Sequence, residues 1–167
     1  MLGELFYMLA KAFGYTPQAT LDDYIKHVRS HFGKINRHEI AFGELKAELA
    51  NLGIRCMTDM PDSKKRYTDF ETMKEIIPWL TYRADYYIAQ LEINCDDYAL
   101  WAAADARRIF DIQGVWQAWG DSPLGYHAFN IVRTEKGYFL FEPNSGFPFA
   151  GVLFEIGGNE YVPKVWK

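Results

Sequence analysis

The stretch INCDDYALWAAADARR, residues 93–108, decides how the fold is interpreted. Its apolar side chains are mostly alanine and lie nearly all around a helix, which is typical of a helix that other elements approach closely. Asn94 can cap this helix, and Asp97 follows three residues later. We therefore expect a central, buried helix over about residues 95–109.

The sequence after Gly114 has a different character. Short runs rich in Val, Ile, Tyr, Phe and Trp alternate with turn signals such as DSPLG, TEKG and PNSG. This pattern predicts antiparallel strands joined by hairpins. The runs are VWQAWG, YHAFNIVR, GYFLFE, GVLFEI and EYVPKVW.

The first half is predicted to be helical. Thr20 can cap a helix that Gly33 ends, and Asn36 precedes a second amphipathic pattern. Thr68 and Glu71 have the spacing of a capping box, and we interpret the KKR run at 64–66 as a solvated loop. The expected helices cover 21–33, 37–53, a short segment ending before Pro78, and part of 79–91.

Helices first and strands last, without β-α alternation, predict an α+β fold. In it, N-terminal helices and the central buried helix pack on a C-terminal antiparallel β-sheet. We expect one domain over residues 1–167, with 1–92 mainly helical and 93–167 contributing the buried helix and the sheet.

Composition limits the classes of partner, compartment and metal site that we expect. The net charge of −4 gives no reason to expect nucleic-acid binding, and no apolar run reaches the roughly 18 residues of a membrane span. No signal peptide is recognisable, so we expect a cytoplasmic protein, while secretion by a route without a signal stays open. The two cysteines have neither metal-ligand nor disulfide-framework spacing. His27 and His31 lie i, i+4 without an evident third ligand, so no metal site is expected.

Cys95 lies at the start of the buried helix. Unpaired N–H groups and the helix dipole favour an anion there, so this position suits a thiolate nucleophile. Asp96 and Asp97 oppose a neighbouring thiolate, and we expect their side chains to point away from the sulfur. Taken alone, Cys95 is more often a buried apolar residue.

A base and an orienting group follow on the predicted hairpin. His127 is the histidine of the sheet half, at the start of a strand and beside Gly125. The hairpin returns along YFLFE, which brings Glu142 back near His127. Glu142 can hold the imidazole in the required tautomer and stabilise its charged form, and Asn144 is the competing candidate.

These three motifs together resemble the papain-like superfamily of cysteine proteases, and NCDDYAL, GYHAFN and FLFEPNSG are similar to the motifs of its transglutaminase-like branch. Glutamate as third member resembles the cysteine-protease domain of a fungal galactose-binding agglutinin and small bacterial or phage relatives. The likeness covers residues 94–146, about a third of the chain.

The resemblance implies that Cys95 is the nucleophile, His127 the general base and then acid, and Glu142 the orienting carboxylate. It also implies a glutamine before the cysteine as an oxyanion donor, for which Gln90 is the candidate. Calcium dependence occurs in the agglutinin relative, but no ligands can be assigned in this sequence, so we expect no cofactor. The expected partner is a peptide or protein substrate.

The expected function is a peptidase or amidase acting through a thioester. A transglutaminase or deamidase would use the same triad, and a non-catalytic binding module of a phage or bacterium would keep the fold alone. Trp119 and Tyr126 flank the turn before His127 and are candidates to line a substrate cleft. Cys56 is interpreted as an incidental thiol, and the oligomeric state is not predicted.

Overall fold

The computed structural model describes residues 20–58, 64–86 and 93–167. The chain divides into two compact units, Met1–Ile35 and Asn36–Lys167, which are considered separately below. A single domain over residues 1–167 therefore stays a prediction. None of the helices in the described ranges has the length and hydropathy that a membrane crossing requires.

The described part of the first unit is helix α2 (Leu21–Ser30). It begins at the expected cap: the Thr20 hydroxyl accepts a hydrogen bond from Asp23 N, and the Asp23 carboxylate accepts one from Thr20 N. The helix ends at Ser30, before the expected stop at Gly33. The His31 ring donates through Nδ1 to the carbonyl of His27, 3.0 Å away.

The second unit begins with a strand where a helix was predicted. Residues 37–53 divide into β1 (His38–Ala41) and α3 (Phe42–Asn51). In β1, Ile40 is buried between two more exposed neighbours, which is the alternation of a strand, and β1 pairs with a partner strand further along the chain. That partner is β3 (Lys64–Tyr67), antiparallel to β1.

The prediction of a solvated loop at residues 64–66 is wrong, because this segment is β3. Lys65 is buried, with its ammonium over the ring of Phe42 at 5.7 Å. Lys64 pairs with Glu39 across the two strands. Residues 1–92 are therefore less purely helical than expected, since β1, β2 (Arg55–Cys56) and β3 all lie within them.

Helix α4 (Phe70–Ile76) also starts differently from the prediction. Its cap is Asp69, without a capping hydrogen bond from the side chain, instead of Thr68. The Thr68 hydroxyl donates to the carbonyl of Asn36, and the Asp69 carboxylate accepts from His38. Thr68 thus contacts the chain just before β1, and Asp69 contacts the first residue of β1. Two short 3-10 helices follow, η1 (Ile77–Leu80) and η2 (Ala84–Tyr86).

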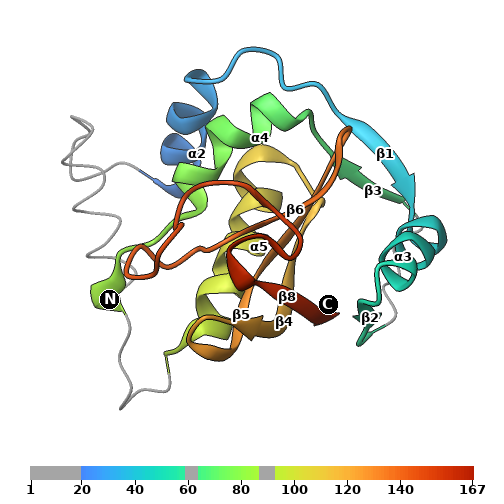
Figure 1. Ribbon diagram of the computed structural model, residues 1–167. Coiled ribbons are helices and arrows are strands. Elements are labelled where there is room, and N and C mark those ends of the chain that lie inside the picture. The colour runs from blue at the N-terminus through green and yellow to red at the C-terminus, as the bar shows by residue number, and fades with distance from the viewer. Residues whose placement is uncertain (1–19, 59–63, 87–92) are drawn as a thin grey trace. The chain divides into compact units, whose positions relative to one another are not determined.

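Helix α5 (Cys95–Phe110) confirms the central prediction of the sequence. Asn94 and Asp97 form the expected capping box, and Ala99, Ala102 and Ala106 are fully buried. The helix runs alongside β4 and β5, as Figure 1 shows. Alanine on the buried side allows this close approach.

The chain is an α+β protein with a six-stranded sheet in the order β2-β8-β4-β5-β6-β7. Neighbouring strands are antiparallel except β2 and β8, which are parallel. The expected C-terminal sheet thus gains one edge strand from the first half. The strands are β2 (Arg55–Cys56), β4 (Val115–Ser122), β5 (Gly125–Thr134), β6 (Gly137–Phe141), β7 (Phe154–Glu155) and β8 (Val162–Trp166).

The two faces of the sheet have different neighbours. Gln117 and Asn130 reach α5, whereas the adjacent Trp116 and Phe129 belong to a core that includes Leu45 of α3. Alternation along a strand therefore places α5 on one face and α3 on the other.

Candidate active site

Cys95 is the first residue of α5. The Asn94 side chain accepts a hydrogen bond from Asp96 N at 3.1 Å, which fixes the first turn behind the cysteine. The thiol is not in a disulfide and is half-buried. The residue therefore lies where helix N–H groups and the dipole favour an anion.

His127 lies near the start of β5, and its side chain is nearly fully buried. Nε2 lies 2.7 Å from Oε2 of Glu142. A hydrogen bond also joins the ring to Cys95, and because Glu142 takes Nε2, this bond falls to Nδ1. The imidazole thus links the sulfur to the carboxylate.

Cys95 contacts the section of β5 that extends beyond the end of β6. The β5–β6 ladder runs from Thr134↔Gly137 to Asn130↔Phe141, and residues 125–129 lie outside it. In this section of β5, Ala128 N–H donates to the sulfur of Cys95. The sulfur therefore contacts two consecutive residues of β5, one through its side chain and one through its backbone.

Glu142 follows β6 directly and is fully buried. Besides His127, its carboxylate accepts from Asn144 N at 2.9 Å and from the Tyr161 hydroxyl at 3.4 Å. The side-chain oxygen of Asn144 instead accepts from Gly146 N. Of the two predicted candidates, Glu142 meets the imidazole, while Asn144 supports the carboxylate through its backbone.

The surroundings of the pair favour its charged form. Burial lowers the pKa of His127, but the hydrogen bonds to Cys95 and Glu142 and the charge of Glu142 outweigh burial and raise that pKa to about 9. Burial raises the pKa of the Cys95 thiol, but hydrogen bonds from His127 and Ala128 N–H lower it overall. Asp96 opposes this effect by its negative charge. Both pKa shifts therefore act in the direction that favours a thiolate beside an imidazolium over the neutral pair.

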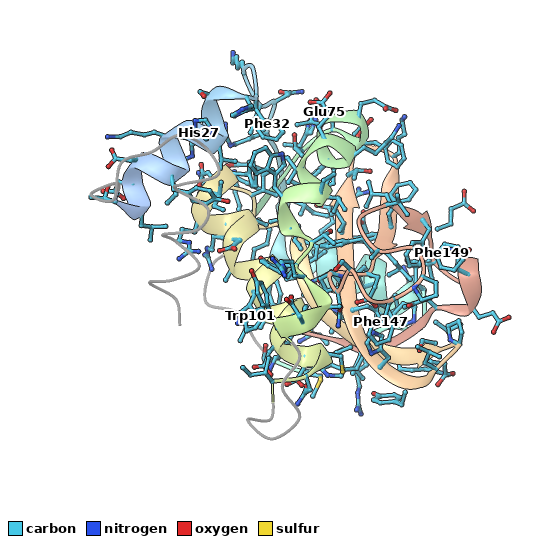
Figure 2. All side chains as sticks on the ribbon, turned by 90° about the vertical axis from the view of Figure 1, so that its left-hand side faces the viewer. His27, Phe32, Glu75, Trp101, Phe147 and Phe149 are labelled. Carbon is cyan, nitrogen blue, oxygen red and sulfur yellow. The ribbon has the colours of Figure 1, made fainter. Side chains whose placement is uncertain are left out.

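Aromatic rings enclose the imidazole. Phe147 is labelled in Figure 2 and lies in the loop after β6. Its ring stacks on His127 with ring centroids 4.6 Å apart and an angle of 18° between the planes. Tyr161 meets the imidazole edge to face at 6.3 Å. Sequence reasoning missed both residues, because nothing in their local sequence indicates that β8 and this loop return to His127.

The remaining predicted site residues have different placements. Trp119 is half-buried opposite Ala128, and the Lys167 ammonium lies 5.1 Å from its ring centroid. Tyr126 is 67% exposed, so it borders open solvent beside His127. Gln90 lies outside the described residues. Cys56 is a free thiol on β2 that donates to the carbonyl of Thr58, and β8 and β4 separate it from β5.

No family model matches this chain, and no curated protein matches it either. The likeness to papain-like and transglutaminase-like enzymes therefore rests on the three sequence motifs. Among residues 20–58, 64–86 and 93–167, no three histidine, cysteine or acidic side chains gather to hold a metal ion.

Proposed function

We propose that the protein is a cysteine-dependent acyl-transfer enzyme, most simply a peptidase or amidase. The observation that carries this proposal is the chain of hydrogen bonds from Cys95 through His127 to the buried Glu142. A thiol, a base and a group that orients the base are the parts that thiol catalysis needs. Their order along the chain and their positions on helix and strands fit the papain-like resemblance.

In the acylation step, the Cys95 thiolate attacks the carbonyl carbon of an amide, and a carbon–sulfur bond forms while the carbonyl π electrons move to oxygen. The main-chain N–H of Cys95 itself is the donor at the start of α5 that would stabilise the resulting oxyanion, because Asp96 N already donates to Asn94. The His127 imidazolium then gives its proton to the leaving nitrogen. The carbon–nitrogen bond breaks, an amine departs and a thioester remains on Cys95.

In the deacylation step, neutral His127 takes a proton from water, and the hydroxyl oxygen attacks the thioester carbon. The carbon–sulfur bond breaks, and the acid leaves while the thiolate–imidazolium pair is restored. Glu142 keeps Nδ1 directed at the sulfur throughout and stabilises the imidazolium. A primary amine in place of water would give transamidation from the same thioester.

Covalent labelling with a thiol-reactive peptide probe tests this proposal. We expect one label per chain, on Cys95. Cys95→Ala should abolish labelling, His127→Ala should reduce its rate by at least about a hundredfold, and Glu142→Gln should reduce it less. Cys56→Ala is the matched control, since it removes the other thiol and should leave the rate unchanged.

Mass spectrometry of the intact protein gives the rate, and peptide mapping gives the position of the label. If His127→Ala labels as fast as wild type, the proposed mechanism is wrong. A Cys95 thiol no more reactive than Cys56 would instead indicate the non-catalytic binding module.

A further inference from the structure

Two buried amide side chains face α5 from the sheet. Gln117 of β4 and Asn130 of β5 are paired in the β4–β5 register, and they are 4% and 0% exposed. Burying an amide costs free energy unless its polar groups find partners. Residues in the middle of a sheet are usually apolar at such positions, so the partners of these two amides require an explanation.

Both amides donate to main-chain carbonyls of α5. Gln117 Nε2 lies 2.8 Å from the Asp96 oxygen, and Asn130 Nδ2 lies 2.9 Å from the Ala99 oxygen. Asn130 Nδ2 also lies 3.1 Å from the Trp116 oxygen on its own sheet. Asp96 and Ala99 are three residues apart and thus share a face of the helix. The neighbouring strands β4 and β5 therefore each bind one main-chain carbonyl on the same face of α5.

The alanine packing in the middle of α5 does not supply the same precision. The buried side of the middle of the helix is alanine, at Ala99, Ala102 and Ala106. Methyl groups of equal size permit close approach, but they distinguish poorly between small translations or rotations of the helix. Hydrogen bonds weaken steeply as their distance and angle change. The two amides therefore fix the axial position and rotation of this middle section of α5, while the buried Tyr98, Ile109 and Phe110 hold the rest of the helix.

We propose that Gln117 is a positioning residue for the nucleophile. The carbonyl that it holds belongs to Asp96, the residue next to Cys95, so this bond fixes the Asp96–Asp97 peptide, one peptide away from the nucleophile. With that peptide fixed, the sulfur stays within reach of both His127 and Ala128 N–H. Asn130 holds the helix one turn further on and anchors it as a whole.

This inference rests on the proposed function for its consequence in catalysis, but its test requires no substrate. The charged groups that act on the Cys95 sulfur are His127 of β5 and Asp96 of α5. The neighbouring Ala128 N–H also stabilises the thiolate. If α5 shifts, the sulfur loses its hydrogen bonds with β5 while Asp96, on its own helix, moves with it. The thiolate is then destabilised.

The test is the pH dependence of Cys95 alkylation by iodoacetamide, in full-length protein carrying Cys56→Ala. In wild type, the rate should rise with a midpoint below the ordinary thiol value of about 8.5. Gln117→Met removes the donor at similar volume. We expect its midpoint to rise by about one unit, so that alkylation at a pH well below the wild-type midpoint falls about tenfold.

Gln117→Asn keeps an amide, but the shorter side chain no longer reaches the Asp96 carbonyl. This variant replaces Gln117→Met in the test if the methionine variant does not fold. We expect the same shift, with a melting temperature within about 5 °C of wild type. Asn130→Leu is the comparison: it should lower the melting temperature more and move the midpoint less.

Three results would overturn the inference. An unchanged midpoint in a folded Gln117 variant would show a purely structural role. An equal midpoint shift in Asn130→Leu would show that the effect is not specific to the Asp96 carbonyl. A wild-type midpoint at the ordinary thiol value would contradict the proposed function itself, and the inference with it.

Discussion

The two aspartates after Cys95 have different effects although they are adjacent. The Asp97 carboxylate accepts from Asn94 N at 3.0 Å and completes the cap, as the sequence led us to expect. Asp96 opposes the thiolate, also as expected, because its charge raises the pKa of the Cys95 thiol. The start of α5 thus combines one carboxylate that stabilises the helix with one that disfavours the Cys95 thiolate.

Asp96→Asn should therefore make the thiol more reactive. Removing a negative charge near the sulfur stabilises the thiolate, so the pKa of Cys95 should fall and alkylation below that pKa should accelerate about threefold. Iodoacetamide kinetics in a Cys56→Ala background measure this. Asp97→Asn is the control: it should lower the free energy of unfolding by about 1 kcal/mol without accelerating alkylation. A slower Asp96→Asn variant would contradict the prediction.

His127 offers a second prediction at the residue scale, because its imidazolium is stabilised by the Glu142 carboxylate. In wild type, the ring should lose its proton at a pH of about 9. In Glu142→Gln, the negative charge is absent, the charged ring is less favoured, and the midpoint should fall by about 1–3 units. Nuclear magnetic resonance titration of the ring measures both values, and His127→Ala assigns the signal. An unchanged midpoint in Glu142→Gln would contradict the assigned role.

At the scale of elements, local signals in the sequence predicted α5 and the main hairpins well. The capping box at Asn94 and the turn sequences between strands depend on neighbouring residues alone. The β1–β3 pair could not be found this way, since its strands are four residues long and lie more than twenty residues apart. Lys65 illustrates the difficulty, because a lysine is normally solvated and this one is buried.

Gly120 controls how β4 and β8 meet. The β4–β8 register shifts between Trp119 and Gly120, and a Cβ at Gly120 would collide with the backbone of Val162 and Pro163. Gly120→Ala should therefore lower the free energy of unfolding by about 1–3 kcal/mol. Gly43→Ala in α3 is the control, since no atom lies within 4 Å of its added Cβ and helix propensity favours alanine. Urea unfolding measures both, and equal effects would contradict this explanation.

At the scale of the whole chain, the site draws on segments far apart in the sequence. Cys95, His127 and Glu142 could be proposed from their motifs, because each motif is local and the hairpin brings the last two together. Tyr161 and Phe147 could not, since their contacts with the imidazole depend on how β8 and the loop after β6 pack. Gln117 was missed for the same reason: its role follows from the approach of α5 to the sheet.

The central claim is that Cys95 carries an acyl group during turnover. The most direct measurement incubates the protein with a mixture of peptide amides, quenches with acid and identifies adducts by mass spectrometry. We predict an adduct on the Cys95 peptide whose mass equals the acyl portion of a released product, absent in Cys95→Ala and retained in Cys56→Ala. Turnover that persists in Cys95→Ala, or a mixture left uncleaved and unmodified beside an unlabelled Cys95, would contradict the claim.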